Sequence, residues 1–261
     1  GERLDLGGRT IRFIHFPWVH WPETMLSYLE EDKILFSCDL FGSHLASSDL
    51  LVRDEERVYE PARRYFAEIM MPFRKIIQKN WPVLEGLKVE LIAPSHGPIY
   101  DRPAFIIDAY KKWIADQPEN SVLIAWVSMH GSTARMVDHL TWELAGRGIK
   151  VMPFNLAVTD LGNLAMSLVE AATIIVASPT ILTGLHPLVA EAVFLVNALR
   201  PKALFAGFIG SYGWKSRAFD QLKAGLDSVR FELLNPVQIK GDPRPEDLAL
   251  LTRLADDIYQ K

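Results

Sequence analysis

The sequence has little of what several protein classes require. Its 261 residues include one cysteine, Cys38, which excludes a disulfide within the chain and is typical of a reducing compartment. No apolar run is long enough to cross a bilayer, because Glu191 and the Arg200-Pro-Lys202 triplet interrupt the longest candidate, residues 190–210. No signal peptide is recognisable at the start of the sequence. We therefore expect a cytoplasmic protein with no membrane partner.

An excess of charge of one sign is also absent. The chain has 28 Lys and Arg against 32 Asp and Glu, its formal net charge is −4, and the two signs are interspersed. Nucleic-acid binding needs a concentration of basic residues, so we expect no nucleic-acid partner. What the chain does have is a hydrophobic fraction of 49%, which is ample for the core of one large domain or two modest ones.

Residues 121–148 have the pattern of a strand, a loop and a helix. The run from Ser121 to Val127 is almost entirely apolar, as expected of a strand buried on both faces of a parallel sheet. Ser128-Met-His-Gly-Ser-Thr133 follows it, and a helical pattern follows the loop. Backbone N–H groups and hydroxyls at a helix start can hold a phosphate without a cation. A capped helix start without a ligand is the ordinary alternative.

Strand and helix patterns alternate from there to the end of the sequence. Five such units predict an α/β domain over residues 121–261, with a doubly wound five-stranded parallel sheet and ligands at the carboxyl ends of its strands. We expect the later strands at residues 149–154, 173–177, 203–209 and 229–234, and the later helices at residues 161–171, 187–199, 215–226 and 243–259.

Residues 1–116 have a different rhythm and predict a separate domain. Short strands with tight links are expected at residues 10–16, 26–29, 34–38 and 89–93. A long helix is expected at residues 61–79 and another at residues 103–115. Gln117-Pro-Glu-Asn120 has the composition of a linker between the two domains.

Three loops follow strands of the second region at the places where a flavodoxin-type sheet binds flavin mononucleotide (FMN). The first would hold the phosphate, and the others would flank the isoalloxazine ring, with Tyr212 or Trp214 as a stacking surface. Taken alone, Trp214 would be interpreted as a core aromatic. Absence of a G-x-G-x-x-G turn favours FMN over FAD. The candidate FMN-binding residues are Ser128, Met129, His130, Gly131, Ser132, Thr133, Ser178, Pro179, Thr180, Ile181, Leu182, Thr183, Gly184, Ser211, Tyr212, Gly213 and Trp214.

The first region contains three candidate metal ligands. His20 precedes Trp-Pro, Asp39 follows an expected strand, and His96 ends another. Two imidazoles and a carboxylate from separate strand ends can converge on iron or zinc, and a carboxylate can bridge two ions. Each residue also has an ordinary interpretation, such as a packed loop histidine or an Asp that caps a turn. His15 and His44 are left out of the metal site.

The motifs together resemble those of flavodiiron proteins, in which a metallo-β-lactamase-like αββα domain precedes a flavodoxin-like domain. The resemblance covers essentially the whole chain and is carried by His20-Trp-Pro-Glu-Thr24, Phe36-Ser-Cys-Asp39, Ser95-His-Gly97, Ser178-Pro-Thr180 and Gly210-Ser-Tyr-Gly-Trp214. It implies an oxidoreductase that passes electrons through FMN to a non-haem di-iron site, which reduces dioxygen to water, nitric oxide to nitrous oxide, or both.

The resemblance also implies roles for the three metal ligands. His20 would bind one iron, His96 the other, and Asp39 would bridge them, with no catalytic residue beyond these ligands. The family's remaining ligands come from an upstream H-x-E-x-D segment, which this sequence lacks. We therefore expect the chain to supply half of a metal site and the C-terminal part of the first domain. The missing segment is expected as a separate chain, as the other product of a nick, or as a part lost by truncation or divergence.

Three functions compete at this stage. The first is FMN-fed reduction of O₂ or NO at a di-iron site completed by another segment. The second is a metal-free FMN electron carrier or redox sensor. The third is a metal-dependent hydrolase of the β-lactamase type, which the flavin loops disfavour. The sequence does not decide between O₂ and NO, because that preference depends on groups around the metals.

Partners follow from the same reasoning. The chain has no Cys-x-x-Cys pair and so no rubredoxin module of its own, and the resemblance implies a small electron donor such as rubredoxin. The short Pro-containing linker cannot fold one site freely over the other. A head-to-tail homodimer would bring each flavin to the partner's metals, so we expect at least a dimer, with Trp214 and the His20-Trp21-Pro22 loop near the interface.

Overall fold

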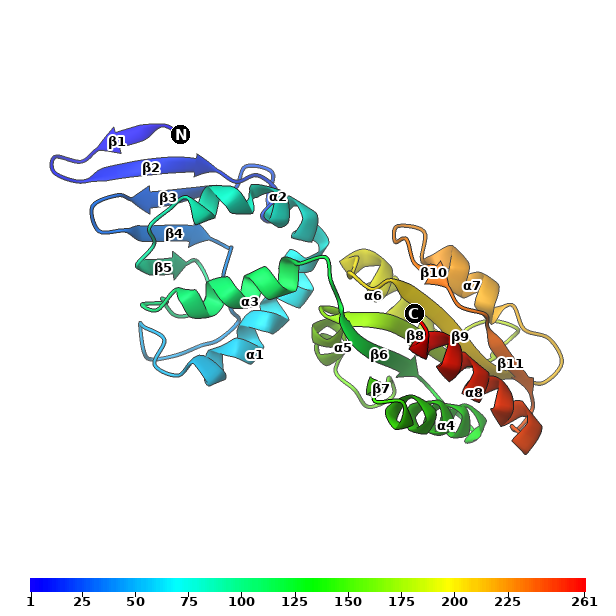
Figure 1. The fold of residues 1–261 in the computed structure, drawn as a ribbon. Coiled ribbons are helices and arrows are strands. Elements are labelled where there is room, and N and C mark those ends of the chain that lie inside the picture. The colour runs from blue at the N-terminus through cyan, green and yellow to red at the C-terminus, as the bar shows by residue number, and fades with distance from the viewer. The chain divides into compact units, whose positions relative to one another are not determined.

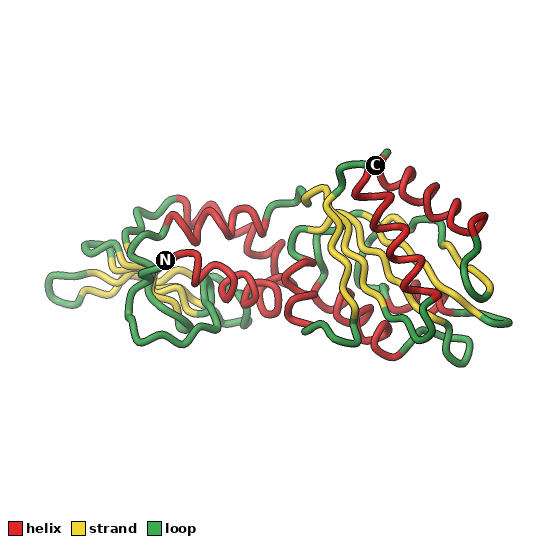
Figure 2. Tube along the Cα trace, turned by 90° about the horizontal axis from the view of Figure 1, so that it is seen from below, coloured by secondary structure: helices red, strands yellow, loops and turns green.

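The computed structural model describes all 261 residues and divides them into two compact units, Gly1–Ala115 and Asp116–Lys261 (Figure 1). Each unit has its own sheet, and Figure 2 shows the strands of each with the helices that lie against them. None of the helices combines the length and hydrophobicity that a bilayer span requires.

The first unit is built on a five-stranded sheet in the order β1-β2-β3-β4-β5. Strands β1 to β4 are antiparallel neighbours, and β5 runs parallel to β4. The pairing of β4 and β5 shifts register between Phe36 and Cys38, so the end of β4 bends immediately before Asp39. The strands are β1 (Arg3–Asp5), β2 (Thr10–His15), β3 (Met25–Leu29), β4 (Ile34–Cys38) and β5 (Leu91–Pro94).

Helices of the first unit pack on one face of this sheet. The helical region predicted over residues 61–79 is instead α1 (Glu55–Tyr65), a π-helical turn (Phe66–Met70), a 3₁₀ turn (Met71–Phe73) and α2 (Arg74–Glu85). Pro72 lies in the 3₁₀ turn, where its missing N–H is tolerated better than inside an α-helix. α3 (Ala104–Ile114) completes the layer.

The two faces of this sheet differ in burial. Leu35 and Ile92 are buried and line a cavity of about 300 Å³ together with residues of α2 and α3. Side chains that alternate with the buried ones remain exposed, notably Met25 of β3 and Phe36 of β4. Because successive side chains of a strand point to opposite faces, these apolar residues mark a second face that the helices do not cover.

The second unit is a doubly wound parallel sheet in the order β10-β9-β8-β6-β7, with β11 also paired to β9. All of its pairings are parallel. The strands are β6 (Glu119–Trp126), β7 (Lys150–Asn155), β8 (Ala171–Pro179), β9 (Phe205–Tyr212), β10 (Glu232–Leu233) and β11 (Val237–Lys240). Segments β10 and β11 lie along successive parts of β9, so they fill one strand position of a five-position sheet.

The fifth strand corrects the sequence-based expectation. A strand was predicted at residues 229–234, whereas the longer pairing with β9 is made by β11, Val237–Lys240. Pro236 separates the two segments. A proline has no N–H for the ladder, so the edge strand is interrupted there and resumes after it.

Helices cover both faces of this second sheet (Figure 1). Apolar residues of α4 (Ser132–Gly146) and α8 (Pro245–Tyr259) join strand residues in one buried cluster, which places these two helices on the same face. α5 (Leu161–Leu168), α6 (Pro187–Leu199) and α7 (Ala218–Gly225) complete the unit. The strands that they enclose are nearly all apolar, and their carboxyl ends are left to the connecting loops.

Candidate functional site

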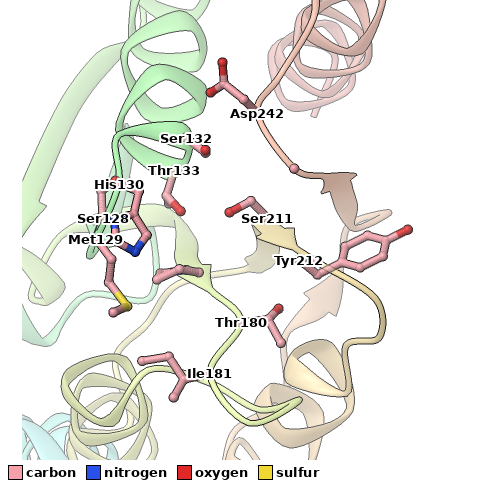
Figure 3. A pocket seen from close by; sticks show the side chains of 13 residues that line it. Ser128, Met129, His130, Ser132, Thr133, Thr180, Ile181, Ser211, Tyr212 and Asp242 are labelled. Carbon is pink, nitrogen blue, oxygen red and sulfur yellow. The ribbon is translucent and has the colours of Figure 1, made fainter.

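A cavity of about 420 Å³ lies among the loops that follow the strands of the second unit (Figure 3). The loops after β6, β8, β9 and β11 contribute to it, together with the last residues of β8 and β9. Its position at the carboxyl ends of parallel strands is where doubly wound sheets bind ligands. The lining residues are Ser128, Met129, His130, Ser132, Thr133, Pro179, Thr180, Ile181, Ser211, Tyr212, Gly213, Gly241 and Asp242.

The loop after β6 offers the elements of an anion site. Gly131 has a φ of 93°, which lets the chain turn sharply into α4, and its N–H donates to Ser128 Oγ at 3.1 Å. The Thr133 side chain is 1% exposed, and its hydroxyl has no hydrogen-bond partner. Figure 3 shows that hydroxyl directed toward the cavity, opposite the Ser211 hydroxyl. An unsatisfied buried hydroxyl at a helix start fits a phosphate that is bound there.

Three hydrogen bonds join the loop after β8 to the end of β9 and to the segment that follows it. Thr180 N–H donates to Ser211 O at 2.9 Å, and Thr180 Oγ1 donates to Ser216 Oγ at 2.9 Å. Arg217 N–H donates to Thr183 O at 2.6 Å. These segments are therefore held in place before a planar ligand binds between them and the loop after β6.

Ser178, at the end of β8, holds the loop that follows this strand. It is fully buried and accepts from His186 N–H at 3.0 Å, and His186 Nδ1 in turn accepts from Leu188 N–H at the start of α6. The loop after β8 is thereby fixed between a strand end and a helix start.

Eleven of the predicted FMN-binding residues line the cavity, and six do not. Gly131 is the N-cap of α4, and Ser178 is a buried residue at the end of β8 that accepts a hydrogen bond from His186 N–H. Leu182 is 92% exposed and Trp214 is 84% exposed, so neither is enclosed by the cavity. The six predicted residues outside the lining are Gly131, Ser178, Leu182, Thr183, Gly184 and Trp214.

The fourth loop, which contributes Gly241 and Asp242, was not predicted from the sequence. Gly241 N–H donates to Tyr212 O at 2.8 Å, which anchors this loop beside the loop after β9. Asp242 accepts a charge-assisted hydrogen bond from Arg135 of α4. The alternation of Val237-Gln-Ile-Lys240 before Gly241 was the signal that could have located this strand end.

The first unit brings together His20, Asp39 and His96. Nε2 of His20 lies 3.3 Å from one carboxylate oxygen of Asp39, and Nε2 of His96 lies 3.5 Å from the other. The Asp39 side chain is largely buried, and its carboxylate is the meeting point of the three groups. No group of three His, Cys, Asp or Glu side chains surrounds a single metal position, so the arrangement differs from a closed mononuclear site.

Backbone hydrogen bonds connect the loops that carry two of these groups. Ser95 N–H donates to Cys38 O at 2.8 Å, and Ser43 N–H donates to His96 O at 3.1 Å. Cys38 has a φ of 51°, in the left-handed region, at the bend that directs Asp39 out of β4. The positions of Asp39 and His96 are therefore coupled through the backbone.

Aromatic rings surround these polar groups. Tyr65 packs against the rings of His44 and His96, with centroids 4.8 and 5.8 Å away. Burial raises the pKa of Tyr65 well above its ordinary value, and the nearby Asp39 charge raises it further, so the phenol stays protonated. His44 contacts the rings of Tyr65 and His96 rather than Asp39, so it lies at the edge of the cluster.

The donor set suits borderline metals but cannot complete a pair of sites. Two imidazoles and a carboxylate are ligands that iron and zinc accept. With one imidazole on each side of a shared carboxylate, each of two ions would have two protein ligands, fewer than the four that closed metal sites use. The three side chains are therefore chemically suited to binding a metal but do not complete a site by themselves.

The family model described as ODP family beta lactamase matches residues 1–97. Among curated relatives, the chain is 34% identical over 259 residues to the nitric oxide reductase of Moorella thermoacetica, covering 95% of this chain and 64% of that protein. It is 31% identical over 269 residues to the anaerobic nitric oxide reductase flavorubredoxin of Escherichia coli, covering all of this chain and 56% of that protein.

Solved structures give the same pattern. Rubredoxin oxygen:oxidoreductase from Desulfovibrio gigas matches with a TM-score of 0.92 and 29% identity, over 100% of this chain and 67% of that one. The flavodiiron protein of Giardia intestinalis matches with a TM-score of 0.88 and 26% identity, over 99% of this chain and 66% of that one. The chain thus spans somewhat less than two thirds of the curated relatives' length.

Proposed function

The chain belongs to the flavodiiron proteins, and from this premise we propose that it passes electrons through FMN to a non-haem di-iron site that reduces dioxygen, nitric oxide or both. The observation that carries the proposal is the coexistence of the two sites in one chain. A cavity with an unpartnered hydroxyl at a helix start lies in one unit, and two imidazoles on a shared carboxylate lie in the other.

In the flavin site, each group of lining residues has a distinct role. Ser132 and Thr133, with the N–H groups at the start of α4, would bind the FMN phosphate. Thr180, Ile181 and the chain around Tyr212 would orient the isoalloxazine ring, because their loops are hydrogen-bonded to each other. Bound FMN would supply the ability to take up and release electrons singly or in pairs.

In the metal site, His20 and His96 would each bind one iron, and Asp39 would bridge the two. The bend at Cys38 and the hydrogen bonds to the neighbouring loop hold the carboxylate between the imidazoles. When bound, an iron pair would bind diatomic molecules and share the electrons that reduce them. The buried ring of Tyr65 would limit the access of water from its side of the cluster.

We further propose that residues outside this chain complete the metal site. The three described ligands are too few for two irons. The uncovered face of the first sheet, with Met25 and Phe36 exposed, fits a further layer of structure. The relatives are longer than this chain, so their additional residues can supply both ligands and layer, in the same polypeptide or as a separate chain.

The partners that we propose are a small electron donor and a second copy of the chain. The names of two relatives associate them with rubredoxin, which supports a rubredoxin-type donor here. A head-to-tail homodimer would bring each FMN close to the partner's irons. Exposed Trp214 at the flavin loops and exposed Trp21 beside His20 support such a contact.

Metal and flavin analysis of the purified protein tests this proposal. The chain alone should bind one FMN and no stable iron pair. With the missing ligand segment supplied in trans, iron should approach two per FMN. O₂ or NO consumption should appear when a chemically reduced rubredoxin-type donor is added, and His96→Ala should abolish the iron.

The controls separate the competing functions. His15→Ala should leave iron unchanged, since His15 lies outside the cluster. FMN without iron, even after the segment is added, would favour a metal-free electron carrier. Zinc without FMN would favour a hydrolase. Tight binding of two irons by the unaided chain would contradict the proposed completion of the site by other residues.

A further inference from the structure

The flavin cavity contains a carboxylate where its proposed ligand would bring negative charge. Asp242 is the one acidic residue in the lining, and no Lys or Arg is present there. Figure 3 shows Asp242 near the start of α4, on the side of the cavity that holds Ser132 and Thr133. A phosphate and a carboxylate on the same side of one cavity repel each other unless a cation offsets one of them.

The nearest observed cation is the guanidinium of Arg135. Its Nη1 donates to Asp242 Oδ2, and the bond joins residues 107 positions apart in the sequence. Arg135 is fixed by the first turn of α4, where its N–H donates to Gly131 O. Asp242 is fixed through Gly241, whose N–H donates to Tyr212 O. Both partners therefore extend from backbone that also forms the cavity wall.

We propose that the Arg135–Asp242 pair sets the affinity of this site for the phosphate of a flavin. Asp242 opposes the phosphate, and Arg135 offsets Asp242. The inference rests on the proposed FMN site and adds to it a charge-based determinant of ligand specificity. A flavin that carries a terminal phosphate responds to the pair, whereas riboflavin, which has no phosphate, does not.

The exposure of the pair makes the inference testable without unfolding the protein. The Arg135 and Asp242 side chains are 52% and 62% exposed. Ion pairs at such exposure contribute little to stability, so removing either charge leaves the fold intact. The electrostatic effect on a phosphate bound in the cavity persists in these variants, and it weakens as salt rises.

Titration of the full chain with FMN and with riboflavin tests the proposal. Arg135→Met should weaken FMN binding by about tenfold, because it leaves Asp242 uncompensated. Asp242→Asn should tighten FMN binding several-fold, because it leaves Arg135 free to attract the phosphate. The double variant should return to within about threefold of the original affinity. Riboflavin affinity should change by less than twofold throughout, and the FMN effects should shrink in high salt.

A second ion pair in the same unit provides the matched control. Lys150 lies 3.7 Å from Glu119, and these are the first residues of β7 and β6, at the amino ends of the strands. Lys150→Met removes the same charge as Arg135→Met, far from the carboxyl-end loops, and should leave FMN affinity unchanged.

Three results would overturn the proposal. The first is FMN affinity within twofold of the original in both Arg135→Met and Asp242→Asn. The second is a parallel change in riboflavin affinity, which would indicate a structural effect. The third is the absence of FMN binding by the unsubstituted chain, which would overturn the proposed function as well. Titration of the unsubstituted chain with FMN distinguishes this result from the other two.

Discussion

At the scale of single residues, the Thr133 hydroxyl is the most direct indication of a ligand. It is buried, lines the cavity and has no partner. We predict that the double substitution Ser132→Ala with Thr133→Ala weakens FMN binding, because each hydrogen bond to a charged group contributes roughly 1.5–3 kcal/mol. Fluorescence titration with FMN measures the loss. Ser167→Ala removes an exposed hydroxyl that bonds Asn163 O within α5, and it should have no effect. Unchanged affinity in the double variant would refute the phosphate assignment.

Gly97 is a second residue whose identity matters, because it follows the proposed ligand His96. Its φ is +85°, and a Cβ there would lie 2.1 Å from Ser43 Oγ. We predict that Gly97→Ala destabilises the protein by roughly 2–4 kcal/mol, from the left-handed backbone and the overlap together. Urea unfolding measures the change.

The control for this substitution is Gly7→Ala in the same unit. Gly7 has a φ of +80°, and a Cβ there would meet nothing within 4 Å. It should therefore lose only the conformational part, about 1 kcal/mol. Equal losses in both variants would mean that the contact with Ser43 has no role.

Site residues could be located from the sequence where the strand before them had a clear pattern. Three strand ends at the cavity were located to within a few residues, because these strands are nearly continuous apolar runs. Residues 178–179 and 210–212, which were expected in loops, are instead the last residues of β8 and β9. Gly241 and Asp242 were missed because the strand before them was expected too early, at residues 229–234. Tyr212 or Trp214 was expected to offer a stacking surface to the ring. Tyr212 lines the cavity, whereas the Trp214 side chain is exposed, and a pattern of residue types does not determine where a loop side chain points. The grouping of His20, Asp39 and His96 was expected from the sequence and its family resemblance, whereas the distances between them follow only from the fold.

At the scale of elements, α4 and α8 are joined by a polar network around Glu143. Arg147 donates to Glu143 at 2.6 Å and also bonds Asp256, and Thr252 Oγ1 donates to Glu143 at 3.1 Å. The hydrogen bond from Arg147, followed by that from Thr252, lowers the pKa of Glu143 below its ordinary value of 4.5.

This lowered pKa predicts a dependence of stability on pH. A carboxylate with a lower pKa in the folded state stabilises it above the unfolded pKa, and this contribution is lost as pH falls through the folded pKa. Glu143→Gln should therefore reduce stability at pH 7, and its difference from the original protein should shrink as pH falls below about 4.5. Urea midpoints at several pH values measure this. Glu191→Gln, at an exposed position on α6, should show no such convergence.

Elements with strong periodicity were predictable, and short or interrupted ones were not. The helix expected at residues 187–199 coincides with α6. By contrast, β1 is a three-residue edge strand with every side chain exposed, so no hydrophobic pattern marks it. The helical region of the first unit was expected as one helix, because periodicity does not reveal the π-helical and 3₁₀ turns that interrupt it.

At the scale of the whole molecule, we predict that the complete protein is at least a dimer. The proposed reason is that electrons must pass between flavin and iron, and exposed Trp214 and Trp21 lie at the two sites. Sedimentation at micromolar concentration should show the dimer, and Trp214→Ser should weaken it. Trp142→Ser changes a similarly exposed tryptophan on the outer surface of α4 and serves as the control. A monodisperse monomer with fast flavin-to-iron electron transfer would contradict the arrangement.

The four loops of the flavin cavity also determine when the site can form during synthesis. They begin at Ser128 and end at Asp242, so the ribosome must add more than a hundred residues between the first lining residue and the last. At translation rates of roughly 5–20 residues per second, the phosphate loop is made about 6–23 seconds before Asp242. The nascent chain cannot enclose a flavin until its final strand has emerged, and cofactor loading is therefore an event of the finished unit.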